Sequence, residues 1–340
     1  MIGTANGNRV SITGLGTSVP ARVLTNDELA ELVDTTDEWI VTRTGIRERR
    51  VAGPDEALSD FCLPAARDAL ERAGVRAVDL DLVIVATVTP DMVFPATAAL
   101  VADQLGAVKA GAYDLSAGCT GFVYALAQAH AMLAAGVARR ALVVGADLLS
   151  KVVDWSDRAT CVLFGDGAGA VVLERVERGG FLGFELGADG SGGMDLYVAA
   201  GGSRKPASSE TVAAGEHFAR MNGREVFKFA TRVLVSSARE LLDVVGLTVE
   251  DVDLYVPHQA NIRIINHAAE KLGIPDEKVV VNVDRYGNTS SGSIPLALAD
   301  AVRDRRLHDG DIVLMTGMGA GLTWGSGVME WTHEMEEMAA

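Results

Sequence analysis

The chain has 340 residues, and its 30 lysines and arginines stand against 46 aspartates and glutamates, which gives a formal net charge of −16. So acidic a chain excludes a general nucleic-acid binder, because phosphate binding requires a basic surface. Hydrophobic residues make up 49% of the chain, yet no apolar run approaches the roughly 20 residues of a membrane span. The composition favours a soluble globular enzyme without nucleic-acid or membrane partners.

Three cysteines, Cys62, Cys119 and Cys161, are too few and too scattered for a disulfide framework or a zinc site. We therefore expect no metal. Such sparse use of cysteine favours a reducing, cytoplasmic compartment.

The first half of the chain alternates expected strands and helices. Thr25 and Glu28 form a capping-box pattern at the start of one helix, and Leu82–Ala86 is a continuous apolar run typical of a sheet buried on both faces. The expected elements are a strand at 9–16, helices at 25–33, 36–43 and 58–73, a strand at 82–86, a helix at 95–106, a strand from 113, a helix from 122, and strands at 141–145 and 168–174.

The second half repeats this order. Helices are expected at 225–245, 262–272 and 292–303, and strands at 252–258, 279–283, 312–316 and 322–331. The repetition predicts an α/β protein of two duplicated halves packed face to face, residues 1–178 and 179–340. The Gly- and Ser-rich stretch 187–223 is irregular and is expected to form a lid or wall of a site.

Cys119 lies at a strand-to-helix turn between Gly118 and Gly121. A helix N-terminus carries partial positive charge and unpaired N–H groups, so a lowered thiol pKa is expected. The alternative is a small apolar cysteine packed beneath a helix. If the halves are duplicates, Asn288 occupies the matching turn of the second half. His258 follows a strand at its carboxyl end, where ligand sites of α/β sheets gather.

Taken singly, His258 fits a hydrogen-bonded structural histidine and Asn288 fits a turn residue or helix cap. Together with a cysteine, the two residue types favour nucleophilic catalysis. A Cys/His/Asn set also serves cysteine hydrolases, in which the asparagine orients the histidine.

Five blocks of sequence, in order, resemble the signatures of the β-ketoacyl-acyl-carrier-protein synthase III family. They are DEWIVTRTGI at 37–46, DLSAGCTGF at 114–122, FGDGAGA at 164–170, VPHQAN at 256–261 and YGNTSS at 286–291. The resemblance runs from about Val10 to Trp331 and argues against a hydrolase. It implies the thiolase fold, a five-layered αβαβα stack of two duplicated halves, and a homodimer.

The implied reaction has two halves and needs no cofactor. Cys119 first takes the acyl group of an acyl-CoA primer. Malonyl-acyl carrier protein then loses CO2, and its enolate attacks the acyl-cysteine to give β-ketoacyl-acyl carrier protein, the first step of fatty-acid synthesis. His258 and Asn288 would present N–H donors to the thioester oxygen, where an aspartate at 288 would repel the developing charge.

The oxyanion of the acylation step needs backbone donors. One is the N–H of Cys119, and the resemblance assigns the other to the loop that contains Gly319 and Ala320. Family members usually carry Phe and three glycines in this loop, where this chain has Met318 and Ala320.

Coenzyme A is the substrate that the resemblance places on a further set of residues. Trp39 would stack on the adenine with Arg158 on its other face and Arg43 near the phosphates. Gly223 and Asn261 would line the pantetheine tunnel. The alternative is ordinary helix packing for the tryptophan and solvated arginines.

Two further sets follow from the resemblance. The primer pocket would be lined by Val88, Phe94, Leu149 and Phe164. The acidic carrier protein would dock on Arg224, Lys228, Arg263 and Lys271, which otherwise are scattered surface charges. Open alternatives are a polyketide-priming ketosynthase III, a thiolase-fold acyltransferase that serves another acceptor, and a non-catalytic partner subunit.

Overall fold

The computed structural model describes residues 2–4 and 9–332. Its first half forms a five-stranded sheet in the order β2-β8-β7-β5-β6. The central strand β5 runs parallel to both of its neighbours, whereas β8 is antiparallel to β7 and β2. The strands are β2 (Val10–Ser18), β5 (Leu82–Ala86), β6 (Gly111–Leu115), β7 (Arg140–Leu148) and β8 (Asp166–Arg175).

The second sheet follows the order β1-β9-β14-β13-β12. Its last four strands repeat the order and pairing sense of β2, β8, β7 and β5. The added edge strand β1 comes from the N-terminus, so residues 2–4 pair with the second sheet although the sequence groups them with the first half. The strands are β1 (Ile2–Thr4), β9 (Gly180–Ala188), β12 (Leu254–Pro257), β13 (Ile312–Gly319) and β14 (Thr323–Glu330).

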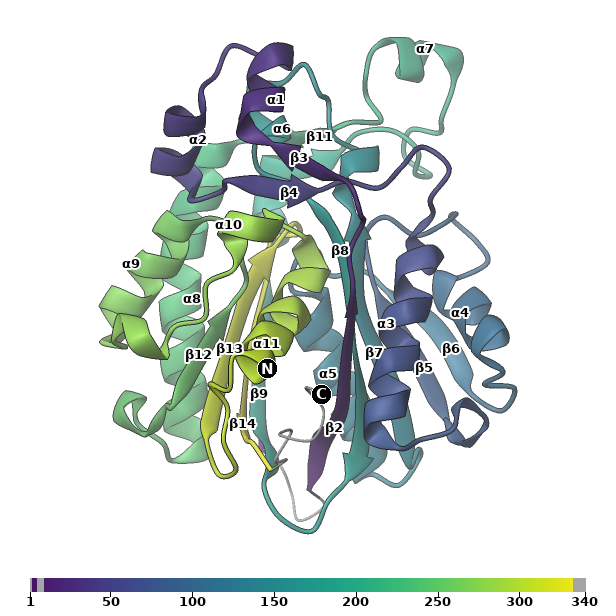
Figure 1. Cartoon of the computed structure of the whole chain (residues 1–340), viewed down its shortest axis with the longest axis vertical. Coiled ribbons are helices and arrows are strands. Elements are labelled where there is room, and N and C mark those ends of the chain that lie inside the picture. The colour runs from purple at the N-terminus through teal and green to yellow at the C-terminus, as the bar shows by residue number, and fades with distance from the viewer. Residues whose placement is uncertain (1, 5–8, 333–340) are drawn as a thin grey trace.

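Six helices complete the stack (Figure 1). They are α3 (Leu58–Ala73), α4 (Thr97–Leu105), α5 (Gly121–Ala134), α8 (Gly223–Val245), α9 (Ile262–Leu272) and α11 (Ser293–Arg303). The helices α3 and α4 cover the outer face of the first sheet, and α8 and α9 that of the second. Both α5 and α11 pack against strands of the two sheets. The predicted αβαβα stack is therefore confirmed, and the turns that precede its two central helices lie where the halves meet.

The remaining elements are short. They are β3 (Val23–Thr25), α1 (Asn26–Leu32), α2 (Asp37–Thr44), β4 (Glu48–Arg50), α6 (Arg158–Cys161), β10 (Leu196–Val198), α7 (Ser209–Ala213), β11 (Ala219–Met221) and α10 (Val283–Tyr286). Single 3₁₀ turns are η1 (Ala77–Asp79), η2 (Leu149–Lys151), η3 (Gly190–Asp195), η4 (Val249–Asp251), η5 (Asp276–Lys278) and η6 (Ser290–Gly292). The capping box of α1 is confirmed.

The expected strand at 279–283 is wrong. Val279 makes only an isolated bridge to Tyr255, and Val283 already begins α10. The buried amide of Gln259 explains the difference, since it bonds this backbone itself. Its Nε2 donates to the oxygen of Val280 at 3.0 Å, and its Oε1 accepts from the N–H of Asn282 at 2.9 Å. The Gln259 side chain thus bonds backbone N–H and C=O groups that a neighbouring strand would otherwise pair with.

None of the helices within residues 2–4 and 9–332 is both long enough and apolar enough to cross a membrane.

Candidate active site

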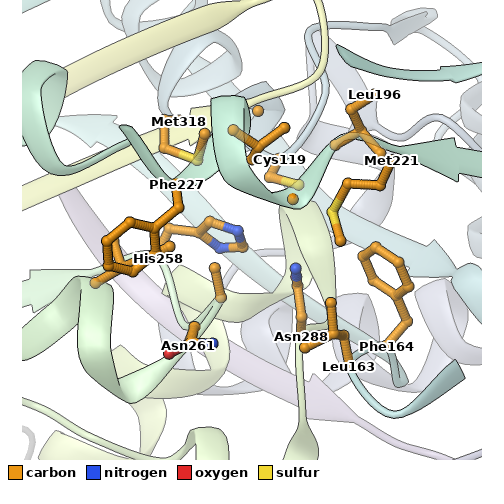
Figure 2. A pocket seen from close by; sticks show the side chains of 15 residues that line it. Cys119, Leu163, Phe164, Leu196, Met221, Phe227, His258, Asn261, Asn288 and Met318 are labelled. Atoms are coloured by element: carbon orange, nitrogen blue, oxygen red, sulfur yellow. The ribbon is translucent and has the colours of Figure 1, made fainter. Parts of the chain in front are cut away.

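Cys119, His258 and Asn288 line one cavity of about 200 Å³. Cys119 comes just before α5, His258 follows β12, and Asn288 lies between α10 and η6. Figure 2 shows the three side chains pointing toward one another from these elements. The other lining residues are Leu163, Phe164, Leu196, Met221, Gly223, Val226, Phe227, Ala260, Asn261, Ile264, Met318 and Gly319. The cavity is thus apolar around three convergent polar groups.

His258 is held as a neutral hydrogen-bond donor. Its Nδ1 lies 2.6 Å from Ser293 Oγ, which also accepts the N–H of Gln259 at 3.4 Å. A ring proton on Nε2 is the tautomer in which Ser293 Oγ donates to Nδ1 and Nε2 acts as the donor toward the cavity. Nε2 is buried without a hydrogen-bond partner among the described residues. Burial lowers the pKa of His258 to about 4, so the imidazole is neutral near pH 7.

Asn288 is fixed by its own backbone and by its amide oxygen. Its N–H donates to the oxygen of Leu163 at 2.9 Å, and its carbonyl accepts from Gly165 at 3.0 Å. Its Oδ1 accepts the N–H of Ser290 at 2.9 Å. The amide NH2 is left to face the cavity (Figure 2). Two neutral N–H donors, from His258 and Asn288, therefore face one point near the thiol.

The expectation of a lowered thiol pKa at Cys119 is wrong in this structure. Burial raises the pKa to about 12, and the charge of Asp147 raises it further, whereas the Ser290 hydroxyl and a backbone N–H lower it. Desolvation, the largest of these effects, disfavours the charged form of the thiol. Cys119 is therefore a thiol near pH 7.

The loop between β13 and β14 packs directly on the turn of Cys119. A Cβ atom built on Gly319 would lie 2.3 Å from the Cys119 nitrogen, so this close approach requires glycine. Thr323 ties the two segments together, because its Oγ1 donates to the Ala117 oxygen at 2.7 Å. Ala320 lines a second cavity on the other side of the thiol.

This second cavity has a volume of about 260 Å³ and also contacts Cys119. Val88, Leu149 and Phe164 line it, as the sequence predicted. Phe94 does not: its side chain is 83% exposed, in the loop between β5 and α4. The remaining lining residues are Thr89, Gly118, Val152, Val153, Leu196, Tyr197, Val198, Ala219, Ser290 and Ala320. Since Phe164 and Leu196 line both cavities, the thiol lies where they meet.

The predicted coenzyme A residues come together around Trp39. The guanidinium carbons of Arg43 and Arg158 lie 4.4 and 4.9 Å from the ring centroid. Asn261, which caps α9, donates from Nδ2 to the Arg43 oxygen at 3.1 Å. Asn261 and Gly223 both line the first cavity, so Asn261 links the arginine–tryptophan cluster to the thiol.

The predicted docking residues lie exposed on two packed helices, α8 and α9. Arg224 directly follows Gly223 of the first cavity, and Arg263 follows the cap of α9 by two residues. Lys228 is paired with Glu225 at 2.7 Å. Lys271 lies eight residues beyond Arg263, about 12 Å along the helix. The structure thus brings Arg224 and Arg263 close to the cavity and leaves Lys271 further away.

Several site residues were missed from the sequence. Leu196 and Met221 belong to β10 and β11, short strands within the stretch expected to be irregular, so the expectation of a wall is confirmed. Ser293 and Thr323 carried no signal, because serines and threonines next to turns and helices are typical caps.

Within the part of the chain that the structure describes, no three His, Cys, Asp or Glu side chains gather into a group that could hold a metal ion.

The chain is similar to known proteins over nearly its whole length. Residues 113–190 match the family model 3-oxoacyl-[acyl-carrier-protein] synthase III, and residues 242–331 match the model of its C-terminal part. The chain is 58% identical to a β-ketoacyl-[acyl-carrier-protein] synthase III of Symbiobacterium thermophilum, over 95% of this chain and 98% of that protein. It is 55% identical to a β-ketoacyl-[acyl-carrier-protein] synthase III of Desulfitobacterium hafniense, over 95% of this chain and 98% of that protein.

Solved structures give the same result. The synthase III of Thermus thermophilus is 54% identical with a TM-score of 0.88, over 94% of this chain and 99% of that one. A priming β-ketosynthase of the R1128 polyketide pathway is 39% identical to this chain and has a TM-score of 0.89. The match covers 96% of this chain and 97% of that one.

Proposed function

Because this chain belongs to the β-ketoacyl-[acyl-carrier-protein] synthase III family, we propose that Cys119, His258 and Asn288 carry out its reaction. The chain is an acyltransferase-type condensing enzyme that initiates fatty-acid synthesis. One observation supports the residue assignment above all: a neutral imidazole N–H and an amide NH2 share a cavity with a buried thiol.

In the first half-reaction, Cys119 Sγ attacks the thioester carbon of an acyl-CoA. The oxyanion is stabilised by backbone N–H groups of Cys119 and of the loop of Gly319 and Ala320. The bond to the CoA sulfur breaks, the proton that Cys119 gives up ends on that sulfur, and the acyl group remains on Cys119. Its chain extends into the second cavity, along Val88, Leu149 and Phe164.

In the second half-reaction, the thioester oxygen of malonyl-acyl carrier protein accepts hydrogen bonds from His258 Nε2 and Asn288 Nδ2. The carboxylate leaves as CO2, and its bonding electrons form an enolate that these donors stabilise. The enolate carbon attacks the acyl carbon, the bond to Cys119 Sγ breaks with its electron pair on the sulfur, and that sulfur takes a proton from water to restore the thiol. Apolar walls such as Met318 keep water from the acyl-enzyme.

Substrate contacts follow the same arrangement. Trp39, Arg43 and Arg158 hold the adenine and phosphates, and Gly223 and Asn261 line the path of the pantetheine. The acidic carrier protein docks on Arg224, Lys228, Arg263 and Lys271. No step needs a metal or another cofactor.

We further infer that the enzyme is a cytoplasmic homodimer built of duplicated halves, 1–178 and 179–340, of which residues 1, 5–8 and 333–340 lie outside the described part. The exposed apolar loop Met92, Val93 and Phe94 supports the dimer, because such side chains are normally covered by a partner. Covered in this way, Phe94 would contact the partner rather than its own primer cavity. Sedimentation should give twice 35.7 kDa.

The two enzymatic alternatives are not favoured. The curated relatives named above, at 55–58% identity, are the fatty-acid enzymes, whereas the polyketide enzyme is 39% identical. An acyltransferase with a non-malonyl acceptor would not need donors for an enolate.

An assay of products tests the proposal. With acyl-CoA and malonyl-acyl carrier protein, the wild type should form β-ketoacyl-acyl carrier protein and CO2 in equal amounts, and Cys119→Ala should form no condensation product. Acyl transfer to an acceptor without CO2 release would contradict the proposal and support the acyltransferase.

A further inference from the structure

Asp147 is a fully buried carboxylate near the end of β7, and the mechanism above does not use it. Its Oδ1 accepts hydrogen bonds from Thr87 Oγ1 (2.9 Å), from the N–H of Val88 (2.7 Å), and from the N–H and Oγ1 of Thr89 (3.2 and 3.0 Å). Thr89 Oγ1 in turn accepts the N–H of Leu148 at 2.8 Å. Val88 and Thr89 line the second cavity, so Oδ1 holds one wall of the proposed primer site.

The other oxygen of Asp147 holds a different segment, the turn that follows Asn288. Oδ2 accepts the N–H of Ser291 at 3.1 Å. The hydroxyl of Ser291 donates to the oxygen of Gly118 at 3.1 Å. Through Ser291, the carboxylate is therefore joined to the turn that carries Cys119.

Ser291 is packed too closely to move independently of its neighbours. A Cβ atom built on Gly145 of β7 would lie 2.3 Å from the Ser291 oxygen, and one built on Gly121 would lie 2.9 Å from Ser291 Oγ. The residue before it, Ser290, donates its N–H to Asn288 Oδ1 at 2.9 Å. A shift of Ser291 would therefore also move Asn288.

The carboxylate of Asp147 is a single acceptor for two hydroxyls and three backbone N–H groups. Hydrogen bonds to an ionised acceptor are stronger than those between neutral groups, and a buried donor that loses its acceptor is costly. Asp147 lines neither cavity, so it can act on the reaction only through the segments that it holds.

We propose that Asp147 is a positioning residue that holds the acyl carbon on Cys119 in line with the enolate formed at Asn288. This proposal rests on the proposed function. The two reacting carbons must approach within about 3–3.5 Å, and Asp147 fixes both sides, through the cavity wall for the acyl chain and through Ser291 for the donor. If they are displaced, the malonyl carboxylate still leaves as CO2, but the enolate carbon takes a proton from water. Acetyl-acyl carrier protein then forms, and the acyl group stays on Cys119.

Asp147→Asn tests the link to Ser291 selectively. The amide oxygen can replace Oδ1 and keep the donors of 87–89, but the NH2 then faces the N–H of Ser291, and two donors cannot pair. With preformed acyl-enzyme and malonyl-acyl carrier protein, we expect condensation to slow about tenfold and initial CO2 release to exceed β-ketoacyl product at least about twofold. The wild type should give a ratio of one. Acylation should stay within a few-fold of wild type, because it relies on the contact between Cys119 and Gly319.

Asp114→Asn is the matched control. Asp114 also accepts one backbone N–H on each carboxylate oxygen, from Thr97 and Ala98 of α4 (both 2.8 Å), and it lines neither cavity. Its substitution should leave the ratio of CO2 to product at one. Ser291→Ala loses only the bond to Gly118 and should raise the ratio by less than Asp147→Asn does, and it tests the same link if Asp147→Asn does not fold.

The ratio of CO2 to product separates positioning from a structural effect, because a smaller amount of folded enzyme lowers both in proportion. A ratio of one in Asp147→Asn and in Ser291→Ala would overturn the positioning role and leave the proposed function intact, whether or not the rates fall. An equal excess of CO2 in Asp114→Asn would also overturn it. A wild type that no acyl-CoA acylates would instead contradict the proposed function.

Discussion

At the scale of single residues, the proposed chemistry requires hydrogen-bond donors that carry no charge. His258 is neutral because it is buried, and Asn288 is neutral by nature, so both donate hydrogen bonds without adding charge. In the proposed reaction an enolate forms between them, which places a negative charge in a desolvated cavity. The donors offset that cost only while no other negative charge faces them.

Asn288→Asp tests this requirement with little change of shape. The carboxylate can still accept the N–H of Ser290, but it replaces an NH2 donor by a negative charge. We expect condensation to slow at least about 100-fold, while acylation of Cys119 stays within a few-fold of wild type. Rapid-quench measurement of each half-reaction checks this, with Asn266→Asp, exposed on α9, as control. Equal rates of condensation in variant and wild type would contradict the role of Asn288.

The lowered pKa of His258 also predicts a pH dependence of stability. Between about pH 4 and 6.5 the unfolded state binds a proton at this residue and the folded state does not, so the free energy of unfolding rises with pH. Lowering the pH from 7 to 4.5 should therefore destabilise the wild type by roughly 2–3 kcal/mol more than His258→Gln. Urea titrations at both pH values measure the difference. Asp147 and Asp166 are present in both proteins, so their contributions cancel. Identical losses would mean that His258 is not held neutral.

At the scale of elements, the site is formed by turns that close packing fixes. The turn of Cys119 before α5 and the loop after β13 touch backbone to backbone at Gly319. Thr323 joins them by a hydrogen bond to the Ala117 oxygen. Their relative position therefore decides where the oxyanion donors point.

Gly319→Ala should disturb this contact, because its Cβ would meet the Cys119 nitrogen at 2.3 Å. We expect acylation to fall at least about 100-fold through displacement of the donors. Gly202→Ala, where an added Cβ meets nothing within 4 Å, should leave acylation unchanged. Stopped-flow release of CoA measures both variants. Normal acylation of Gly319→Ala would remove this loop from the oxyanion site.

The sequence predicted helices and strands correctly where the spacing of apolar residues and the types of residue indicated the same kind of element. The helices α5 and α11 and the turns before them followed from apolar spacing, whereas Cys119, His258 and Asn288 were chosen as site residues through the resemblance of five sequence blocks. The strand at 279–283 was predicted wrongly because three consecutive valines look like a strand, while Gln259, distant in sequence, bonds that backbone. The strand β9 was missed because its glycines and the three-residue spacing of its buried Phe181 and Phe184 do not give the period-two alternation typical of a strand.

Side-chain surroundings could not be predicted in the same way. The helix end suggested a lowered pKa for Cys119, yet the pKa depends on burial, which only the packed structure reveals. Ser291 and Ser293 look like ordinary turn and cap residues until their hydroxyls are placed beside Gly118 and His258. Phe94 was assigned to the wall of the primer pocket, but its side chain is exposed in the loop between β5 and α4 and does not line the second cavity.

At the scale of the whole molecule, a net charge of −16 opposes an acidic carrier protein. We propose that docking depends on a local basic surface, to which Arg224 on α8 and Arg263 on α9 contribute. The net charge of the chain repels the carrier protein at long range, whereas the local basic surface attracts it. Salt screens both interactions.

Arg224→Glu combined with Arg263→Glu should raise KM for malonyl-acyl carrier protein about tenfold or more, with a smaller effect on acylation by acyl-CoA. Lys271→Glu should have a weaker effect, because it lies further along α9. Arg67→Glu, exposed on α3 of the opposite outer layer, is the matched control for Arg224→Glu or Arg263→Glu alone, because each of these variants reverses one charge. Steady-state kinetics with each substrate measure the effect. An equal rise in KM for Arg67→Glu would mean that only net charge matters.

The central claim is that one thiol carries the acyl group between two substrates. Intact-mass measurement after mixing with a panel of acyl-CoAs, followed by malonyl-acyl carrier protein, tests it most directly. We predict an acyl adduct on Cys119 that disappears as β-ketoacyl-acyl carrier protein forms, and the primer that loads fastest identifies the preferred substrate. A protein that gains no adduct from any primer, or whose adduct survives malonyl-acyl carrier protein, would contradict the account.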